Sequence, residues 1–381
     1  MAGSLSAGDL RRMKRIAVTS VGSLVGQNIL DSLEGRRTTI EMVGINSTAA
    51  AAGNFRCDRA YLAPPAARQG EYLERLAAIF FEERPHLVLP GRDDDVLALA
   101  QLKEMQPQLG SSLATGPHRV ALVLGDKWAS HEFARARSLP YVDSALATDL
   151  PAVERLRAVW GYPLIAKPRI GNGSRGVRIV FDEMQLAAVA RLPGYLLQAY
   201  LEPEAELMDW RDLTTDGTPL FHAPMLQQIA CQAVIGPDRG VRGLVCTNVE
   251  LMMGRLERAF CLDDPGVADV ARRYAEALAG EGWVGALNLQ GRRDRSGAFH
   301  VYELNGRYTG GTTARTHLGF DEVGILVEAF TGHALVPWPS VGSHGIVTAS
   351  MSNFPMSSAD IERLEEEGRW QRDAGRRRAD G

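Results

Sequence analysis

Between residues 14 and 115, short apolar runs alternate with longer segments whose apolar residues recur at helical spacing. Strand-like runs occupy 15–22 (RIAVTSVG), 42–46 (MVGIN) and 86–91 (HLVLPG), and helical spacing occupies 23–33 and 71–84. Strands that alternate with helices indicate a parallel, doubly wound sheet. We therefore predict a small α/β domain at this end of the chain.

From Asp126 onward the pattern becomes a mixture of helices and strand pairs. Asp126 is placed to cap a helix over 126–140, and an amphipathic pattern covers 151–160, 182–192 and 267–282. Strand pairs are predicted at 165–180, 195–207, 209–225 and 283–307. This arrangement favours an α+β fold without internal repeats. Toward the end, IERLEEEGRW (361–370) predicts a short surface helix, and we expect the last residues to be disordered.

The segment 165–180 reads IAKPRIGNGSRGVRIV and joins a lysine to a glycine-rich loop between two strand-like runs. A Walker-type loop needs its lysine at the end and a helix directly after it. Here Lys167 comes first, and a β-branched run follows the loop. The segment therefore fits either a flexible hairpin whose backbone N–H groups cover a polyphosphate or an ordinary hairpin with a solvated tip.

Gly22 and Gly26 lie at the first strand-to-helix turn, where dinucleotide-binding proteins carry a glycine fingerprint. The G-x-G-x-x-G spacing is absent, and Asn46 follows the second strand where an acidic residue is expected for NAD. We interpret the glycines as a tight turn. An NAD-dependent oxidoreductase is therefore disfavoured.

The predicted hairpin over 283–307 carries NLQ on one strand and YELN on the other. Glu303 and Asn305 are two positions apart, so they share a face of their strand, and Gln290 is placed to converge with them. Carboxylate and carboxamide oxygens suit Mg²⁺, which takes further ligands from water and nucleotide phosphates. The alternative is a half-buried hairpin with polar residues alternating outward, which explains Gln290 more easily than it explains Glu303.

Composition narrows the class of protein further. The chain has 381 residues, 45% of them apolar, and a net charge of −4. This balance gives no reason to expect nucleic-acid or acidic-membrane partners, and no apolar run approaches a membrane span. The four cysteines show no metal-ligand spacing, so we expect reduced thiols and a cytoplasmic protein.

In their order along the chain, these motifs resemble the ATP-grasp superfamily, and the sequence is similar to carbamoyl-phosphate synthetase and biotin carboxylase domains. The resemblance covers roughly residues 14–335 and includes NFRCDRAYLAP at 54–64. It implies a pre-ATP-grasp α/β domain over 1–115 and an ATP-grasp domain of two α+β subdomains over 116–340. A β-hairpin lid would lie within a subdomain at about 128–195. The segment 341–381, with its charged tail, would follow.

The resemblance also implies roles for individual residues. Gln290, Glu303 and Asn305 would hold Mg²⁺, or Mn²⁺ in its place, and Arg307 would face the reacting phosphoryl group or the carboxylate, with Lys167 as its catalytic companion. Two positions depart from the family, which usually has Glu where Gln290 and Gln198 stand. The ATP contacts would be Lys127, Lys167, Gly173, Ser174, Gln198, Leu201 and Glu206.

The substrate would lie beyond the metal strands. The segment RYTGGTTART supplies Arg307, Thr312 and Arg315, and an arginine fork suits a carboxylate. Asp93 follows the third strand and would bind an amino group, although an acidic cluster at a helix N-terminus is the better explanation of this residue.

The implied chemistry is an ADP-forming ligation. ATP phosphorylates a carboxylate to an acyl phosphate, and an amine displaces the phosphate, with an amino-acid-like substrate expected. Two alternatives remain: a thiol nucleophile on a carrier protein, and a nucleotide-binding protein without catalysis. The family resemblance also suggests a homodimer.

Overall fold

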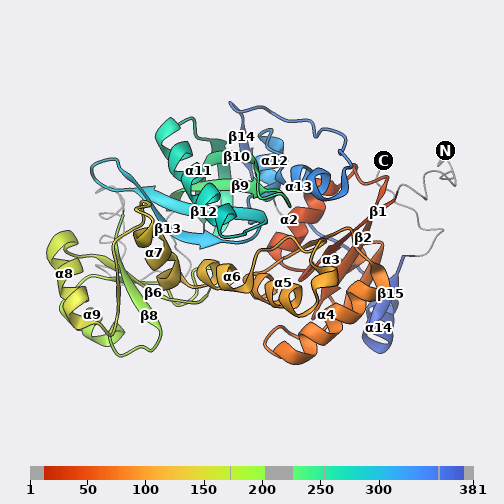
Figure 1. The fold of residues 1–381 in the computed structure, drawn as a ribbon, viewed down its shortest axis with the longest axis horizontal. Coiled ribbons are helices and arrows are strands. Elements are labelled where there is room, and N and C mark those ends of the chain that lie inside the picture. The colour runs from red at the N-terminus through yellow and green to blue at the C-terminus, as the bar shows by residue number, and fades with distance from the viewer. Residues whose placement is uncertain (1–12, 172, 202–225, 253, 351, 373–381) are drawn as a thin grey trace.

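The computed structural model describes residues 13–171, 173–201, 226–252, 254–350 and 352–372. These residues form three sheets, and Figure 1 shows them side by side along the long axis of the molecule. The N-terminal sheet lies at the right in red and orange, the largest sheet lies in the upper middle in green and cyan, and the smallest lies at the left in yellow-green.

The N-terminal sheet has the strand order β15-β3-β2-β1-β4, and its strands β1 to β4 run parallel. In β1 (Lys14–Val18), which lies between β2 and β4, Ile16, Ala17 and Val18 are fully buried because helices cover both faces. The predicted doubly wound domain is therefore confirmed. Its elements are β1 (Lys14–Val18), α2 (Leu24–Leu33), β2 (Ile40–Asn46), α3 (Ala52–Phe55), β3 (Arg59–Leu62), α4 (Gln69–Glu83), β4 (Leu87–Leu89), α5 (Asp93–Met105) and the 3-10 helix η1 (Pro107–Leu109).

The smallest sheet is antiparallel, with the strand order β5-β8-β6-β7. Strands β6 and β7 pair from Leu164↔Val180 to Ala166↔Arg178, which confirms the predicted hairpin over 165–180. The elements of this region are α6 (His118–Gly125), α7 (Lys127–Ala136), β5 (Ser144–Leu146), α8 (Leu150–Trp160), β6 (Leu164–Pro168), β7 (Arg178–Val180), α9 (Glu183–Val189) and β8 (Tyr195–Ala199).

The largest sheet has the strand order β13-β12-β9-β10-β11-β14 and is antiparallel throughout. The predicted hairpin over 283–307 is confirmed as β12 and β13. The long strands β9 to β11 were not predicted, and the strand pair expected at 209–225 lies outside the described residues. The elements are β9 (Leu226–Ile235), β10 (Val241–Met252), β11 (Arg255–Cys261), α11 (Pro265–Gly280), β12 (Gly285–Arg293), β13 (Phe299–Asn305), α12 (Thr312–His317), α13 (Glu322–Thr331) and β14 (Ile346–Thr348).

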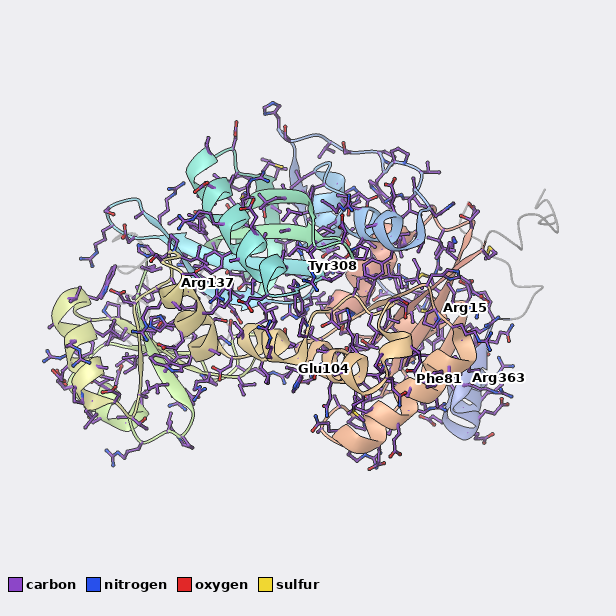
Figure 2. All side chains as sticks on the ribbon, in the orientation of Figure 1. Arg15, Phe81, Glu104, Arg137, Tyr308 and Arg363 are labelled. Carbon is purple, nitrogen blue, oxygen red and sulfur yellow. The ribbon has the colours of Figure 1, made fainter. Side chains whose placement is uncertain are left out.

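The N-terminal domain packs directly on the largest sheet. One apolar cluster joins Ile16 and Ile29 of the N-terminal domain to Val234 of β9 and to Tyr308. Figure 2 shows Tyr308 at the junction of the two regions. The backbone N–H and hydroxyl of Thr313 donate to the Oδ1 of Asn28 in α2 at 3.2 and 3.0 Å. A continuous core of this kind holds the two regions in a fixed relation.

The chain leaves the N-terminal sheet after Leu113, whose backbone forms an isolated parallel bridge with Val88 of β4. This bridge supports our proposal that the first domain ends near residue 115 and that an ATP-grasp domain follows over 116–340. The four-stranded sheet lies mostly within the proposed lid subdomain at about 128–195. Within the described ranges, no helix has the length and apolar character that crossing a membrane requires.

The C-terminal segment returns to the N-terminal sheet. The predicted surface helix is confirmed as α14 (Ser358–Glu367), but the prediction was wrong at its end, where Arg369 and Trp370 belong to the strand β15 (Arg369–Gln371). This strand, which was not predicted, pairs antiparallel with β3. Trp370 is 8% exposed, and its ring meets that of Phe55 edge-on with the centroids 5.3 Å apart. The last nine residues, 373–381, lie outside the described ones.

Replacing Trp370 with alanine is expected to destabilise the N-terminal domain by about 2–4 kcal/mol, because it removes a buried ring from an edge cluster. Urea unfolding monitored by circular dichroism measures this loss. Phe354→Ala is the matched control, since Phe354 is 44% exposed. Equal stability of the two variants would contradict a packing role for β15.

Candidate functional site

A cavity of about 820 Å³ lies where the N-terminal domain, the β6–β7 hairpin and the largest sheet meet. Nearly every residue singled out from the sequence lines this one space, although the residues come from all three regions. The predicted residues that line it are Asp93, Lys127, Lys167, Gly173, Ser174, Gln198, Leu201, Gln290, Glu303, Asn305, Arg307 and Arg315. Glu206 lies outside the described residues.

Lys127 is held at the first position of α7. The Asp126 side chain caps this helix by accepting from the backbone N–H groups of Trp128 and Ala129, and Arg169 pairs with the same carboxylate at 2.5 Å. The ammonium of Lys127 donates to the carbonyl of Gly171 at 2.9 Å and lies 3.3 Å from Glu303 Oε1. The lysine therefore links the glycine-rich loop to the strand pair β12–β13.

Lys167 points from β6 into the cavity wall and is only 7% exposed. Its ammonium lies 4.7 Å from the centroid of the Tyr302 ring, a cation–π distance. Burial lowers the pKa of Lys167 to about 7, against the opposing effect of Glu303, and the nearby Lys127 lowers it further. A polyanion entering the cavity would favour the charged ammonium.

The glycine-rich loop connects β6 to β7 and supplies Gly173 and Ser174 to the cavity. Both residues have positive φ, +61° and +57°, which glycine adopts freely and serine rarely. At Gly176, also at positive φ, a Cβ would lie 2.7 Å from the Tyr195 hydroxyl. That hydroxyl donates to the Gly176 carbonyl at 3.0 Å, so the base of the hairpin is fixed while its tip faces the cavity.

Another part of the cavity wall is formed by β8 and the residues that follow it. Gln198 is 1% exposed, and its Nε2 donates to Ser144 Oγ at 3.1 Å. Leu201 is buried beside it and also lines the cavity. An apolar wall carrying one fixed carboxamide could hold a planar heterocycle.

Four oxygen-bearing side chains lie together on β12 and β13. The strand register places Gln290 opposite Glu303 and Asn288 opposite Asn305, and all four line the cavity. Asn288 is fully buried, and its Oδ1 has no hydrogen-bond partner among the described residues. One carboxylate and three carboxamides fit Mg²⁺ that keeps water and phosphate ligands. Across the described residues, no group of three or more His, Cys, Asp or Glu side chains could hold a metal.

Arg307 and Asp93 lie in contact, although they come from different domains. Nε of Arg307 lies 2.8 Å from Oδ1 of Asp93, and Nη2 donates to Oδ2 at the same distance. Nη2 also donates to Asn305 Oδ1 at 3.3 Å, and Nη1 donates to the Tyr308 carbonyl at 3.1 Å. All three guanidinium nitrogens are therefore engaged, next to a candidate metal ligand. The predicted acidic first turn of α5, which contains Asp93, is confirmed.

Arg315 and Thr312 belong mainly to a buried network. Arg315 is 2% exposed, and its Nη2 lies 2.7 Å from Oε1 of the fully buried Glu322. Nη2 also donates to Thr309 Oγ1 at 2.9 Å and to Thr312 Oγ1 at 3.3 Å. Arg315 lines the cavity, whereas Thr312 is not among the described residues that do so.

The structure adds cavity residues that the sequence analysis did not select. Asn288 lies two positions before Gln290, so the two-residue period of a strand was a sufficient signal. Tyr302 and Arg292 also line the cavity, and the hydroxyl of Tyr302 donates to Gln228 Oε1. A register shift between Gln290 and Gly291 interrupts the alternation, so simple periodicity could not place Arg292.

Comparison with known proteins gives distant but extensive matches. No family model matches the chain. It is 29% identical over 202 residues to the carbamoyl phosphate synthase large chain of Mycobacterium sp. (strain JLS), which covers 50% of this chain and 16% of that protein. The aligned segment thus spans about a sixth of the length of that curated relative.

Two solved structures extend the comparison over most of the fold. The biotin carboxylase domain dimer of the Hydrogenobacter thermophilus 2-oxoglutarate carboxylase, in complex with MgADP, ADP and bicarbonate, superposes with a TM-score of 0.61 at 17% identity. The match covers 88% of this chain and 73% of that one. The L-amino acid ligase of Bacillus licheniformis gives a TM-score of 0.61 at 15% identity over 84% and 74% of the chains. The predicted fold is therefore confirmed.

Proposed function

We propose that the chain is an ATP-grasp enzyme, an ADP-forming ligase that joins a small carboxylic acid to an amine, and its similarity to carbamoyl phosphate synthase and to the two solved structures supports this. The acid is amino-acid-like, and ATP with Mg²⁺ is the energy source. The single observation that supports this most strongly is the convergence of Lys127, Lys167, Glu303, Asn305 and Arg307 on one cavity. The Bacillus licheniformis structure is that of an L-amino acid ligase, and the Hydrogenobacter thermophilus domain is in complex with MgADP.

The nucleotide would occupy the part of the cavity nearest the hairpin. Gln198 and Leu201 would contact its base, Glu206 its ribose, and Gly173 and Ser174 would cover its phosphates. Lys127 and Lys167 supply positive charge from two separate elements, which a polyphosphate needs when it leaves water. Gln290, Glu303 and Asn305, joined by the unpartnered oxygen of Asn288, would hold Mg²⁺ or Mn²⁺ against the same phosphates. The bound metal would neutralise phosphate charge.

The chemical problem is the approach of one anion to another. A carboxylate oxygen of the acid forms a bond to the γ-phosphorus, and the bond from that phosphorus to the β–γ bridging oxygen breaks, which releases ADP. The amine then attacks the acyl carbon, the bond from that carbon to the bridging oxygen breaks so that inorganic phosphate leaves with this oxygen, and the nitrogen loses a proton. Arg307, Lys127 and Lys167 reduce the charge repulsion in a site that excludes water.

Release of phosphate from ATP tests the proposal. The purified protein is incubated with MgATP and separate pools of carboxylic acids, amino acids and amines. Phosphate release that needs an acid and rises with an amine is the expected result. No release under any condition would overturn the ligase and favour a nucleotide-binding protein without catalysis.

A thiol nucleophile on a carrier protein is the second candidate for the acceptor. The same assay with a pantetheine thiol in place of the amine distinguishes the two, because a thioester forms only if the cavity admits the thiol. The Hydrogenobacter thermophilus domain is a dimer, which supports a further proposal that this chain forms a homodimer; light scattering in solution tests it.

Replacing Gln290 with glutamate is expected to lower the Mg²⁺ concentration needed for half-maximal turnover by about 10-fold, because a carboxylate is the stronger ligand for a hard cation. A Mg²⁺ titration at saturating ATP measures this. Gln185→Glu, on the exposed helix α9, is the control. An unchanged titration for Gln290→Glu would place Gln290 outside the metal shell.

A further inference from the structure

Two ion pairs lie at the acid end of the cavity, which we define by Asp93, Arg307 and Arg315. The pair Arg315–Glu322 is 2% and 0% exposed in its side chains, and Glu322 is not among the described cavity-lining residues. The pair Arg307–Asp93 is 13% and 24% exposed, and both partners line the cavity. A ligand can therefore reach and separate only the second pair.

The geometry of Arg307–Asp93 is already that of a guanidinium binding a carboxylic acid. Two parallel bonds, each 2.8 Å, join the two groups. The side-chain carboxylate of Asp93 thus occupies the same edge of Arg307 that a substrate carboxylate would use. An incoming acid must either displace Asp93 or approach Arg307 from another side, and Nη1 on that side is already bonded to the Tyr308 carbonyl.

Charge decides which acids can make this exchange. An acid without an amino group would separate the Asp93 carboxylate from the Arg307 guanidinium and bring a second negative charge beside that carboxylate, and both effects oppose binding. An acid that also carries an ammonium group supplies a positive charge for Asp93 in exchange for that of Arg307. Its carboxylate takes the guanidinium, its ammonium takes Asp93, and one ion pair becomes two without any charge left over.

We propose that Asp93 is a specificity residue that selects zwitterionic acids by exchanging its bond with Arg307 for a bond with the substrate's ammonium group. This inference rests on the proposed ligase function and defines the substrate class further: the ammonium group must lie close to the reacting carboxylate, as it does in an α-amino acid. Dicarboxylic acids and simple alkanoic acids are excluded by the same charge argument.

Hydroxamate formation tests the inference without knowledge of the natural amine. The full-length protein is incubated with MgATP, hydroxylamine and either the twenty standard amino acids or the matching acids that lack the amino group. The wild-type protein is expected to form hydroxamate at least about 100-fold faster from the amino acids, since a site that binds a substrate's amino group rejects the analogue that lacks it. Asp93→Asn is expected to reduce this preference to about 10-fold or less.

Asp94→Asn is the matched control, because Asp94 is the next carboxylate of the same helix turn, is 53% exposed and pairs with Arg92 at 3.5 Å. This variant is expected to keep the wild-type preference. Titration with ADP confirms that each variant is folded. If Asp93→Asn does not fold, the proposed substrate class is tested by the ratio of the wild-type rates with amino acids and with the acids that lack the amino group.

Three results would overturn the inference. If Asp93→Asn lowers the rate of hydroxamate formation equally for the amino acids and for the acids without an amino group, the preference for amino acids is kept. Asp93 then only orients Arg307. If the wild-type protein uses both pools equally well, the substrate class is wrong while the ligase function stands. If neither pool gives hydroxamate although ADP binds, the ligase function fails as well.

Discussion

Glu303→Gln is expected to lower acid-dependent turnover by about 10²–10³-fold, because Glu303 is the only carboxylate among the described residues of the β12–β13 cluster. The substitution keeps the size of the side chain and removes its charge, so a metal held there would lose its strongest protein ligand. The ion pair with Lys127 at 3.3 Å is lost as well. Half-maximal turnover should also need more Mg²⁺.

The effect of Glu303→Gln extends to Lys167. Glu303 raises the pKa of Lys167 against the dominant effect of burial, so its removal shifts that pKa further downward. Glu276→Gln on the exposed face of α11 is the control. Initial rates across a Mg²⁺ series measure the loss of turnover and the higher Mg²⁺ requirement. Turnover by Glu303→Gln at the control rate would exclude the cluster from catalysis.

Nucleotide binding is expected to take up protons at alkaline pH through Lys167. In the free protein the pKa of Lys167 is about 7, so at pH 8 most of these side chains are neutral. A triphosphate beside the amine favours the ammonium form, and binding should take up roughly half to one proton per nucleotide at pH 8. Calorimetry in buffers of different ionisation enthalpy measures this uptake.

Lys167→Met is expected to abolish the proton uptake and to lower turnover by about 10²-fold or more. AMP, which lacks the outer phosphates, serves as the control ligand and should show little uptake with the wild-type protein. Equal uptake by the wild-type protein and Lys167→Met would contradict the assignment of the proton to this lysine.

Lys167 also links stability to pH in the free protein. Its folded pKa is lowered, so the unfolded chain binds more protons between about pH 7 and the usual lysine pKa near 10.4. Stability should therefore rise with pH through this window, and Lys167→Met should weaken that rise. A residue that stabilises a bound polyanion at the expense of the free fold is typical of a functional site.

The parallel domain and the β12–β13 hairpin were predictable because local pattern determines them. In β1, consecutive β-branched and small residues are buried on both faces, and in β13 Glu303 and Asn305 follow the two-residue period. Strands β9 to β11 were not predicted, because their local sequence alone does not distinguish a strand from a loop. Pairing with neighbouring strands of the sheet defines them. The C-terminal strand β15 has three residues, and its pairing with β3 is a contact between distant parts of the chain.

The partners of the candidate site residues were less predictable than their positions. The sequence indicated Asp93 and Arg307 separately as candidate substrate residues. No local sequence pattern indicates that these two side chains, 214 positions apart, bond to each other. The same holds for Arg315, whose partner Glu322 is seven positions away and buried by tertiary packing. Which charges neutralise each other depends on the packing of domains, and that information lies in no single segment.

Transfer of ¹⁸O from the acid to phosphate tests the central claim most directly. The protein is incubated with MgATP, hydroxylamine and amino acids whose carboxylates carry ¹⁸O, and the released phosphate is analysed by mass spectrometry. An acyl phosphate intermediate predicts one ¹⁸O atom in each phosphate, because a carboxylate oxygen becomes the bridge that leaves with phosphorus. Phosphate without the label, released at the same rate, would show that water attacks ATP and would contradict the account.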